Sequence, residues 1–352
     1  MPEATPPGAR AGPGSRPARL SATRLPRPGA LPPPWPGGPV RVRGGEVFVR
    51  RTPWTGPVVQ AGDDAPRERA LYVHGLGGAS TNWTDLAALL AVRFDGWALD
   101  LPGFGRSHPP ARRSYSVRGH VAAVLDVLGC VAAEPGPGEG RPVHLVGNSL
   151  GGLVSLLAAA RRPDLVATLT LVSPAMPVYR VPEAFSRELL LLLLPGVPAL
   201  ADRRMARVTP EQQVRGMAQM CFGDPRRIPR QRLQQVLEEM RERTEQPWAT
   251  AALTRSMRGL IRSYLRVGPA GAWRTAARLH LPSLVVWGDR DRLVSPALAP
   301  RLAAALPDSR LLLLEGVGHV AMMEAAEPTA RAVLALAEDV AGGGGAPRPS
   351  KS

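Results

Sequence analysis

Short runs of apolar residues alternate with longer stretches that repeat apolar residues at helical spacing. Each apolar run is nearly uninterrupted, which is typical of a strand buried on both faces of a parallel sheet. The runs predict strands at 69–75, 96–101, 141–147, 166–173, 282–288 and 309–315. The stretches of helical spacing predict helices at 84–92, 116–128, 150–160, 296–305 and 329–341.

Strands that alternate with helices along a chain form βαβ units, so the pattern predicts an α/β fold with a doubly wound, mostly parallel sheet. Residues 45–59 add candidate antiparallel strands at one edge. Between about 175 and 280 the pattern is helical and contains no convincing strand, which predicts an inserted helical cap or lid. The helices expected there are 183–194, 210–221, 231–243 and 250–267.

These patterns divide the chain into a core, a cap and two tails. The core is expected at 43–174 and 281–341, with the cap at 175–280 between its two parts. Residues 1–42 are rich in Pro, Gly and Arg and have almost no apolar periodicity, and residues 342–352 begin with a run of glycine. Such segments bury too little surface to offset the entropy of ordering them, so we expect both to be disordered.

The formal net charge of +15 admits partners such as nucleic acid, a membrane surface or an anionic acyl carrier. However, the sequence has no run of five or six basic residues, and aromatic residues are not interleaved with the basic ones. Scattered arginines therefore predict no nucleic-acid partner, and a membrane-surface role remains an alternative. The oligomeric state is left open.

The two cysteines, Cys130 and Cys221, are too few and too far apart for a disulfide framework or a metal cluster. The longest apolar run, Leu189–Leu194, is far shorter than a membrane-spanning helix, and no secretory signal precedes the core. We therefore expect a cytoplasmic protein. Leu189–Leu194 is a candidate for lining an apolar acyl pocket, although burial against the core is the alternative.

The strongest local motif is Gly147-Asn148-Ser149-Leu150-Gly151, which follows an expected strand and precedes an expected helix. This is the G-x-S-x-G pattern in the strand–turn–helix context that it requires. The serine sits on a sharp turn, and side chains two residues before or after it would collide with the neighbouring strand and helix. The positive end of the following helix also favours negative charge at this point. Ser149 is therefore the candidate nucleophile.

A serine needs a base, and His319 is the candidate because it lies in the loop directly after the last expected strand. For the other histidines we expect structural or solvated positions. His144 lies in a buried strand, and His74 is expected to fix its own loop through backbone hydrogen bonds. His120 and His108 are expected to be solvated, and His280 is expected to be structural.

The acid that orients the histidine is expected in the loop after the strand at 282–288, where Asp289 and Asp291 both lie. Asp291 is favoured because it stands deeper in the turn, whereas Asp289 is expected to cap that turn. The order Ser, Asp, His is that of triads built on this motif. Backbone N–H groups of Leu150 and of Leu76, in the glycine-rich loop after the first core strand, are the candidate oxyanion donors.

Five motifs together resemble the α/β-hydrolase superfamily over residues 45–340. They are HGLGG at 74–78, DLPGFGRS at 100–107, GNSLGG at 147–152, GDRD at 288–291 and GHVAMMEAAEP at 318–328. The resemblance implies a hydrolase that needs no metal or organic cofactor, with a helical cap over its site. It also implies that Glu324 and Pro328 have structural roles.

The resemblance leaves several reactions open, because the family is chemically diverse. We expect a carboxylesterase or lipase-like enzyme that cleaves a small, apolar ester or related acyl substrate through an acyl-enzyme. A carbon–carbon hydrolase of the meta-cleavage type or an acyltransferase on the same triad is the alternative. Meta-cleavage hydrolases usually carry Trp soon after the histidine, where this chain has Val320 and Ala321. A hydrolase-fold binding protein is the non-enzymatic alternative.

Overall fold

The computed structural model describes residues 16–26, 32–56, 67–110, 114–136, 138–178, 197, 207–265 and 271–342. Its strands are β1 (Arg16–Pro17), β2 (Gly37–Val42), β3 (Gly45–Thr52), β4 (Glu68–Val73), β5 (Phe94–Leu99), β6 (Val143–Asn148), β7 (Val166–Val172), β8 (Ser283–Gly288) and β9 (Ser309–Leu314). They form one sheet in the order β1-β9-β8-β7-β6-β4-β5-β3-β2. Strand β3 is antiparallel to both β2 and β5, and every other neighbouring pair is parallel.

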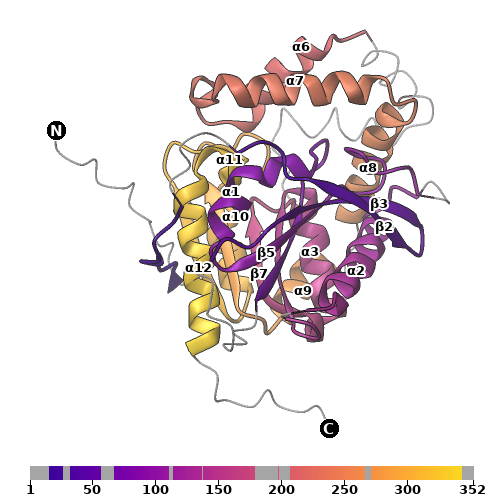
Figure 1. Ribbon diagram of the computed structural model, residues 1–352. Helices are drawn as coiled ribbons and strands as arrows, with labels where there is room; N and C mark the ends of the chain where they lie inside the picture. Colours follow the sequence, from indigo (N-terminus) through magenta and orange to yellow (C-terminus); the bar gives the residue numbers. More distant parts are fainter. Residues whose placement is uncertain are drawn as a thin grey trace.

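Helices cover both faces of the sheet (Figure 1). One face carries α2 (Val117–Ala133), α3 (Leu150–Arg161), α9 (Ala272–Ala277) and α10 (Leu298–Ala305). The other face carries α1 (Thr84–Leu90), α11 (Ala321–Glu324) and α12 (Ala326–Gly342). The central strands are therefore buried on both sides; every residue of β6 and β8 is buried, which explains their uninterrupted apolar sequences.

The observed elements confirm the predicted α/β fold with its mostly parallel, doubly wound sheet. The six strands expected from apolar runs are β4 to β9, and the expected antiparallel edge is β3. Helix ends differ by a few residues. The largest difference is at the end of α2, which extends to Ala133, because Val131 and Ala132 still face the core.

Part of the N-terminal segment expected to be disordered is ordered, so that expectation is wrong for residues 16–26 and 32–42. β1 adds a short parallel strand to the β9 edge, and β2 forms a hairpin with β3. Ser21 is buried, and its backbone N–H donates to the Arg331 carbonyl of α12 at 3.0 Å. Backbone hydrogen bonds and ion pairs hold this segment to the sheet edge and α12, and a few scattered apolar side chains, such as Leu25 and Val42, also pack against the core. These apolar positions are too widely spaced to give a periodic pattern.

The segment expected as a cap contains α6 (Pro210–Cys221), α7 (Arg230–Thr244) and α8 (Ala249–Tyr264). In Figure 1, α6 and α7 lie above the end of the sheet, with α8 descending beside α2. The helix expected at 183–194, which includes Leu189–Leu194, lies outside the described residues. α9 also falls within 175–280, but it packs against α3 and α10 of the core.

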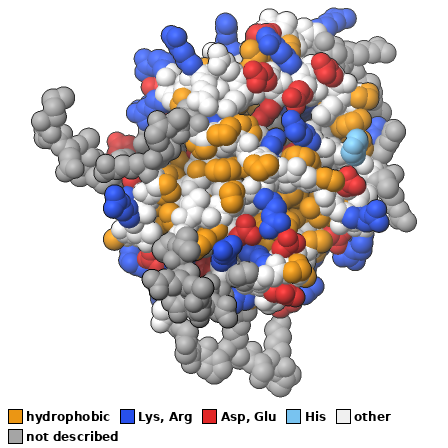
Figure 2. All heavy atoms as spheres, in the orientation of Figure 1, with side chains coloured by type: hydrophobic (Ala, Val, Ile, Leu, Met, Phe, Trp, Pro, Cys, Tyr) orange, Lys and Arg blue, Asp and Glu red, His pale blue; other side chains and the backbone are white. Residues whose placement is uncertain are grey.

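No helix among the residues that the structure describes is both long and apolar enough to span a bilayer. Basic side chains are spread over the face shown in Figure 2 and are interspersed with acidic ones. On this face, therefore, the excess of arginine does not form one continuous basic patch.

Candidate active site

Ser149 stands on a strained turn between β6 and α3. Its backbone has φ 53° and ψ −119°, a conformation that residues with a side chain rarely adopt. Its N–H donates to the Val172 carbonyl of β7 at 3.0 Å. A Cβ on Gly151 would lie 2.2 Å from the Val73 carbonyl oxygen, and one on Gly147 would lie 2.5 Å from the Gly151 oxygen. Backbone packing therefore accounts for both glycines of the motif.

Asp291 and His319 form a buried pair at the same end of the sheet, from the loops after β8 and β9. The distance from His319 Nδ1 to Asp291 Oδ2 is 2.8 Å, and both residues are buried. The other oxygen, Oδ1, accepts the backbone N–H groups of Leu293 and Val294, each at 2.9 Å. The carboxylate is thus fixed by its own turn, and Nε2 is the ring nitrogen left to exchange a proton.

Asp289, the other aspartate of that loop, has a different environment. It is exposed, and its Oδ1 accepts the Gly316 N–H at 2.7 Å. It therefore braces the chain just after β9. Of the two aspartates that the sequence left as candidates, the structure places Asp291 against His319.

Asn148 connects the serine turn to the histidine loop, a link that the sequence did not indicate beyond its place in the motif. Its buried Nδ2 donates to the Val172 carbonyl at 3.1 Å and to the His319 carbonyl at 3.1 Å. The Ser149 hydroxyl itself makes no hydrogen bond with any described residue, so its bond to His319 is not formed in this structure. Catalytic hydrogen bonds often form only once substrate is bound.

The two candidate oxyanion donors belong to segments next to Ser149. Leu150 is the first residue of α3, where a backbone N–H has no acceptor within the helix. Leu76 lies in a tight turn in which Gly78 N–H donates to the Gly75 carbonyl at 3.1 Å. A Cβ on Gly75 would lie only 3.0 Å from the Ser149 Cβ, so this loop packs directly against the serine.

His74 braces the loop that carries Leu76, as expected from the sequence. Its Nδ1 contacts the Gly75 carbonyl at 2.7 Å, and its Nε2 accepts the Leu101 N–H at 2.9 Å. Because Nε2 accepts, Nδ1 carries the proton and the ring is neutral; burial lowers the pKa of His74 accordingly.

The remaining histidines lie away from Ser149 in other surroundings. His144 is buried in β6, with its Nδ1 2.8 Å from the Thr168 hydroxyl. His108 and His280 are exposed. His120, expected to be solvated, is instead fully buried under α8, with its Nε2 3.0 Å from the Ser256 hydroxyl. The expectation for His120 was wrong because the pattern of α2 does not reveal that α8 covers it.

One face of α7 is docked on the loop that carries the candidate oxyanion donor. Arg243 donates from an Nη to the Gly77 carbonyl at 2.8 Å, and Glu239 accepts the Thr81 hydroxyl at 2.8 Å. Arg232 forms a third contact, an ion pair with Asp85 of α1. Burial raises the pKa of Glu239 to about 7.

The end of α6 lies beside the Asp291–His319 pair. Burial, together with the nearby negative charge of Asp291, raises the pKa of the Cys221 thiol to about 11. The thiol therefore stays protonated at neutral pH, which is the unreactive form of cysteine.

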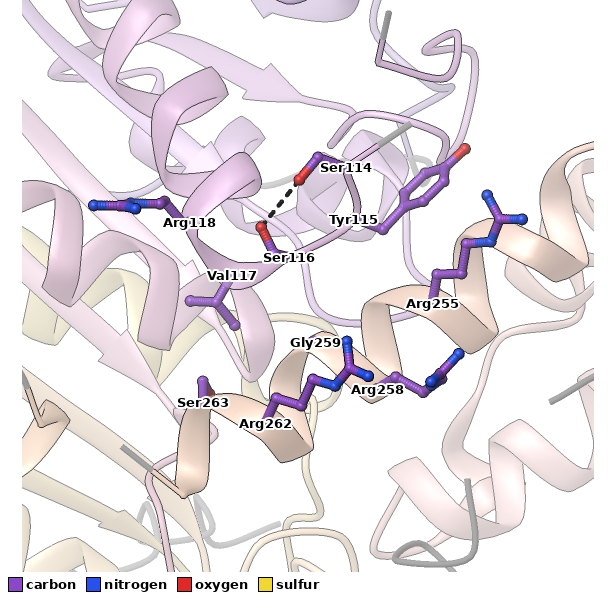
Figure 3. A pocket seen from close by; sticks show the side chains of 10 residues that line it. All are labelled: Ser114, Tyr115, Ser116, Val117, Arg118, Arg255, Arg258, Gly259, Arg262 and Ser263. Atoms are coloured by element: carbon purple, nitrogen blue, oxygen red, sulfur yellow. Dashed lines mark hydrogen bonds between the residues drawn. The ribbon is translucent and has the colours of Figure 1, made fainter. Parts of the chain in front are cut away.

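A hollow of about 470 Å³ lies away from these residues, between α8 and the start of α2 (Figure 3). Arg118, Arg255, Arg258 and Arg262 line it, and no acidic residue does. In Figure 3 the Arg118 side chain points away from α8, so the four guanidinium groups do not converge on one point. The hollow contains none of the candidate catalytic residues.

The chain matches the sequence profile of the alpha/beta hydrolase fold over residues 71–326. An uncharacterized protein of Mycobacterium tuberculosis is 32% identical over 258 residues, which cover 71% of this chain and 69% of the relative. The acetyltransferase component of the acetoin cleaving system of Pseudomonas putida is 33% identical over 76% of this chain and 62% of its own length. Lipase 3 of a Moraxella species is 25% identical over 76% of each chain.

Solved structures agree with these sequence relatives. The crystal structure of a membrane phospholipase A, a bacterial virulence factor, superposes with a TM-score of 0.67 at 26% identity, covering 87% of this chain and 86% of that one. The profile match, the sheet order and the serine turn together define the class: the chain belongs to the α/β-hydrolase family.

Proposed function

We propose that this protein is a serine hydrolase that cleaves a carboxylic ester, or a related acyl bond, of a small apolar substrate. Ser149 is the nucleophile, His319 the general base and Asp291 the acid that orients the histidine. The observation that carries the proposal is the 2.8 Å contact between His319 Nδ1 and Asp291 Oδ2, because it leaves Nε2 available in a loop that Asn148 ties to the serine turn.

In the acylation step, Ser149 Oγ attacks the carbonyl carbon of the substrate while His319 Nε2 accepts the hydroxyl proton. The negative charge that develops on the carbonyl oxygen is stabilised by the N–H groups of Leu76 and Leu150. The tetrahedral intermediate then collapses, and the imidazolium returns its proton to the departing alcohol. Asp291 stabilises the imidazolium without taking the proton.

In the deacylation step, water attacks the acyl-enzyme and His319 acts as base again. The acyl–Oγ bond then breaks, the imidazolium returns its proton to Ser149 Oγ, and the carboxylic acid is released. The sequence departure at Val320 and Ala321 favours ester cleavage over meta-cleavage of a carbon–carbon bond. The similarity to Moraxella Lipase 3 also supports an ester substrate.

A panel of p-nitrophenyl esters with short to long acyl chains tests the proposal. We expect wild-type turnover that falls by at least about 10³-fold in Ser149→Ala, because the nucleophile is removed. Ser295→Ala, which changes an exposed serine outside the site, is the matched control and is expected to keep full activity. Undiminished turnover by Ser149→Ala would reject the proposal.

An acyltransferase is the second candidate, favoured by the similarity to the Pseudomonas putida acetyltransferase component. It uses the same acyl-enzyme but passes the acyl group to an alcohol or thiol in place of water. Product analysis with added primary alcohols or thiols separates the two. A hydrolase forms mainly free acid, whereas a transferase forms mainly the new ester or thioester at millimolar acceptor.

A further inference from the structure

The end of α6 is in direct backbone contact with the loop that carries His319. The His319 N–H donates to the Cys221 carbonyl at 2.7 Å. A Cβ on Gly318 would lie 2.3 Å from that same carbonyl oxygen, and a Cβ on Gly223 would lie 2.3 Å from the Gly316 oxygen. The two segments therefore touch without any side chain between them.

The Glu324 carboxylate joins these two segments. Its Oε2 accepts the Gly223 N–H at 2.9 Å and the Gly318 N–H at 2.8 Å. Its Oε1 accepts the Asp224 N–H at 3.1 Å. Among the described residues Glu324 has no basic partner, so these three backbone N–H groups are what stabilises its carboxylate. Hydrogen bonds to an ionised acceptor are stronger than those between neutral groups, so Glu324 holds the two segments together strongly.

The loop that carries Asp291 is attached to the same end of α6. Arg292, the residue after Asp291, donates from an Nη to the Gln219 carbonyl at 2.6 Å. The last turn of α6 and the residues that follow it thus contact both loops that supply the imidazole and its carboxylate. On one side of these contacts are residues 219–224, which belong to the part of the chain expected to be the cap. On the other side are the loops that follow β8 and β9 of the core.

We propose that Glu324 is a positioning residue, which holds the residues after α6 against the Gly318–His319 peptide and so makes the placement of the His319 imidazole depend on the cap. The sequence assigned Glu324 only a structural role at the start of the terminal helix. The proposal rests on the proposed function for its effect on catalysis, but the contacts themselves are measurable without substrate. Catalysis is sensitive to such placement, since a shift of about 1 Å can cost about 100-fold in rate.

The test compares Glu324→Ala and Glu324→Gln with wild type, using Glu327→Ala as the matched control. Glu327 is an exposed glutamate three residues further on, which pairs with Arg331 of its own helix. Three quantities are measured: kcat and KM on a p-nitrophenyl ester, the downfield proton resonance of His319 Nδ1–H, and hydrogen exchange at the amides of Gly223, Asp224 and Gly318.

For Glu324→Ala we expect kcat to fall by about 10- to 100-fold while KM changes by less than about threefold, because the imidazole is misplaced but the substrate pocket is intact. The His319 resonance broadens or shifts, and the three amides exchange faster. Gln offers one acceptor oxygen for three donors, so Glu324→Gln falls between Ala and wild type. Glu327→Ala matches wild type in all three measurements.

Wild-type kcat and an unchanged His319 resonance in Glu324→Ala would overturn the proposal, even if the three amides lose protection. If Glu324→Ala does not fold, the nearly isosteric Glu324→Gln takes its place in the test, and a wild-type resonance and kcat in that variant overturn the proposal.

Failure of the proposed hydrolase function gives a different result. In that case wild type shows no Ser149-dependent turnover, while the resonance and the exchange rates still report on Glu324.

Discussion

At the scale of single residues, the Asp291 carboxylate divides its two oxygens between two tasks. Oδ1 accepts two backbone N–H groups of its own turn, and Oδ2 faces His319 Nδ1. An amide in its place keeps the shape but offers only one acceptor oxygen. In the proposed triad, the buried carboxylate therefore both anchors itself and fixes the tautomer of the histidine.

Asp291→Asn is expected to lower kcat on p-nitrophenyl acetate by about 10³- to 10⁴-fold, because the imidazole then takes the wrong tautomer. Asp289→Asn is the matched control, since Asp289 is exposed and its carboxylate contacts only the Gly316 N–H among the described residues. We expect that control to keep activity within about threefold of wild type, because the exposed Asp289 carboxylate does not contact His319. Equal losses in the two variants would contradict the assignment of Asp291.

The sequence predicted most of the candidate residues but not how they are supported. Ser149, Asp291 and His319 were recognisable because each lies in a motif directly after an apolar strand. The roles of Asn148 and Glu324 were not recognisable, because their partners are backbone groups of segments far away in the chain. Such contacts depend on tertiary packing and leave no periodic signal.

At the scale of elements, the serine turn depends on the close approach of α3 to the sheet. Gly151 lies where any side chain would meet the carbonyl oxygens of Val73 and His74, at 2.2 and 2.4 Å from a Cβ. Backbone atoms of a central strand cannot move aside as the tip of a flexible side chain can. The glycine therefore permits both the close packing of α3 against β4 and the strained conformation of Ser149.

Gly151→Ala is expected to destabilise the protein by more than about 3 kcal/mol or to prevent folding, because the new methyl group overlaps backbone atoms. Gly129→Ala is the control: it lies in the interior of α2, and its Cβ would meet no atom within 4 Å. We expect that change to be neutral or to stabilise by about 0.5–1 kcal/mol through helix propensity. Urea unfolding of both variants measures the difference, and equal stabilities would contradict the account.

Apolar patterns predicted the strands well because β4 to β9 are buried and uninterrupted. The same patterns missed β1 and β2, whose sequences are rich in Arg, Pro and Gly. Their order comes from pairing with β9 and β3, so a tertiary partner and not local propensity decides it. The burial of His120 was missed for the same reason.

At the scale of the whole molecule, the segment expected as a cap is joined to the rest of the chain by polar contacts along one face of α7. Glu239 is the member whose charge depends on pH near neutrality, since burial raises its pKa from an ordinary 4.5 to about 7. The unfolded chain releases this proton more readily than the folded protein does. The stability of the folded state therefore falls as the pH rises from about 4.5 to about 7, and it stays lower above that range.

Glu239→Gln keeps an acceptor for the Thr81 hydroxyl but carries no charge at any pH. Its melting temperature is expected to match wild type near pH 5 and to exceed it at pH 8, by an amount equivalent to about 1–2 kcal/mol. Glu238→Gln, at the exposed neighbouring position of α7, is the control and is expected to show no such pH-dependent gain. A Glu239→Gln variant less stable than wild type at pH 8 would contradict this interpretation.

The central claim is that Ser149 is a nucleophile activated by His319, and covalent labelling with a fluorophosphonate probe tests it most directly. The account predicts that peptide mass spectrometry finds the phosphonate on Ser149 of the wild type. It also predicts that labelling is absent in Ser149→Ala and at least about 100-fold slower in His319→Ala, because the general base is missing. Labelling of a different residue, or an undiminished rate in either variant, would contradict it.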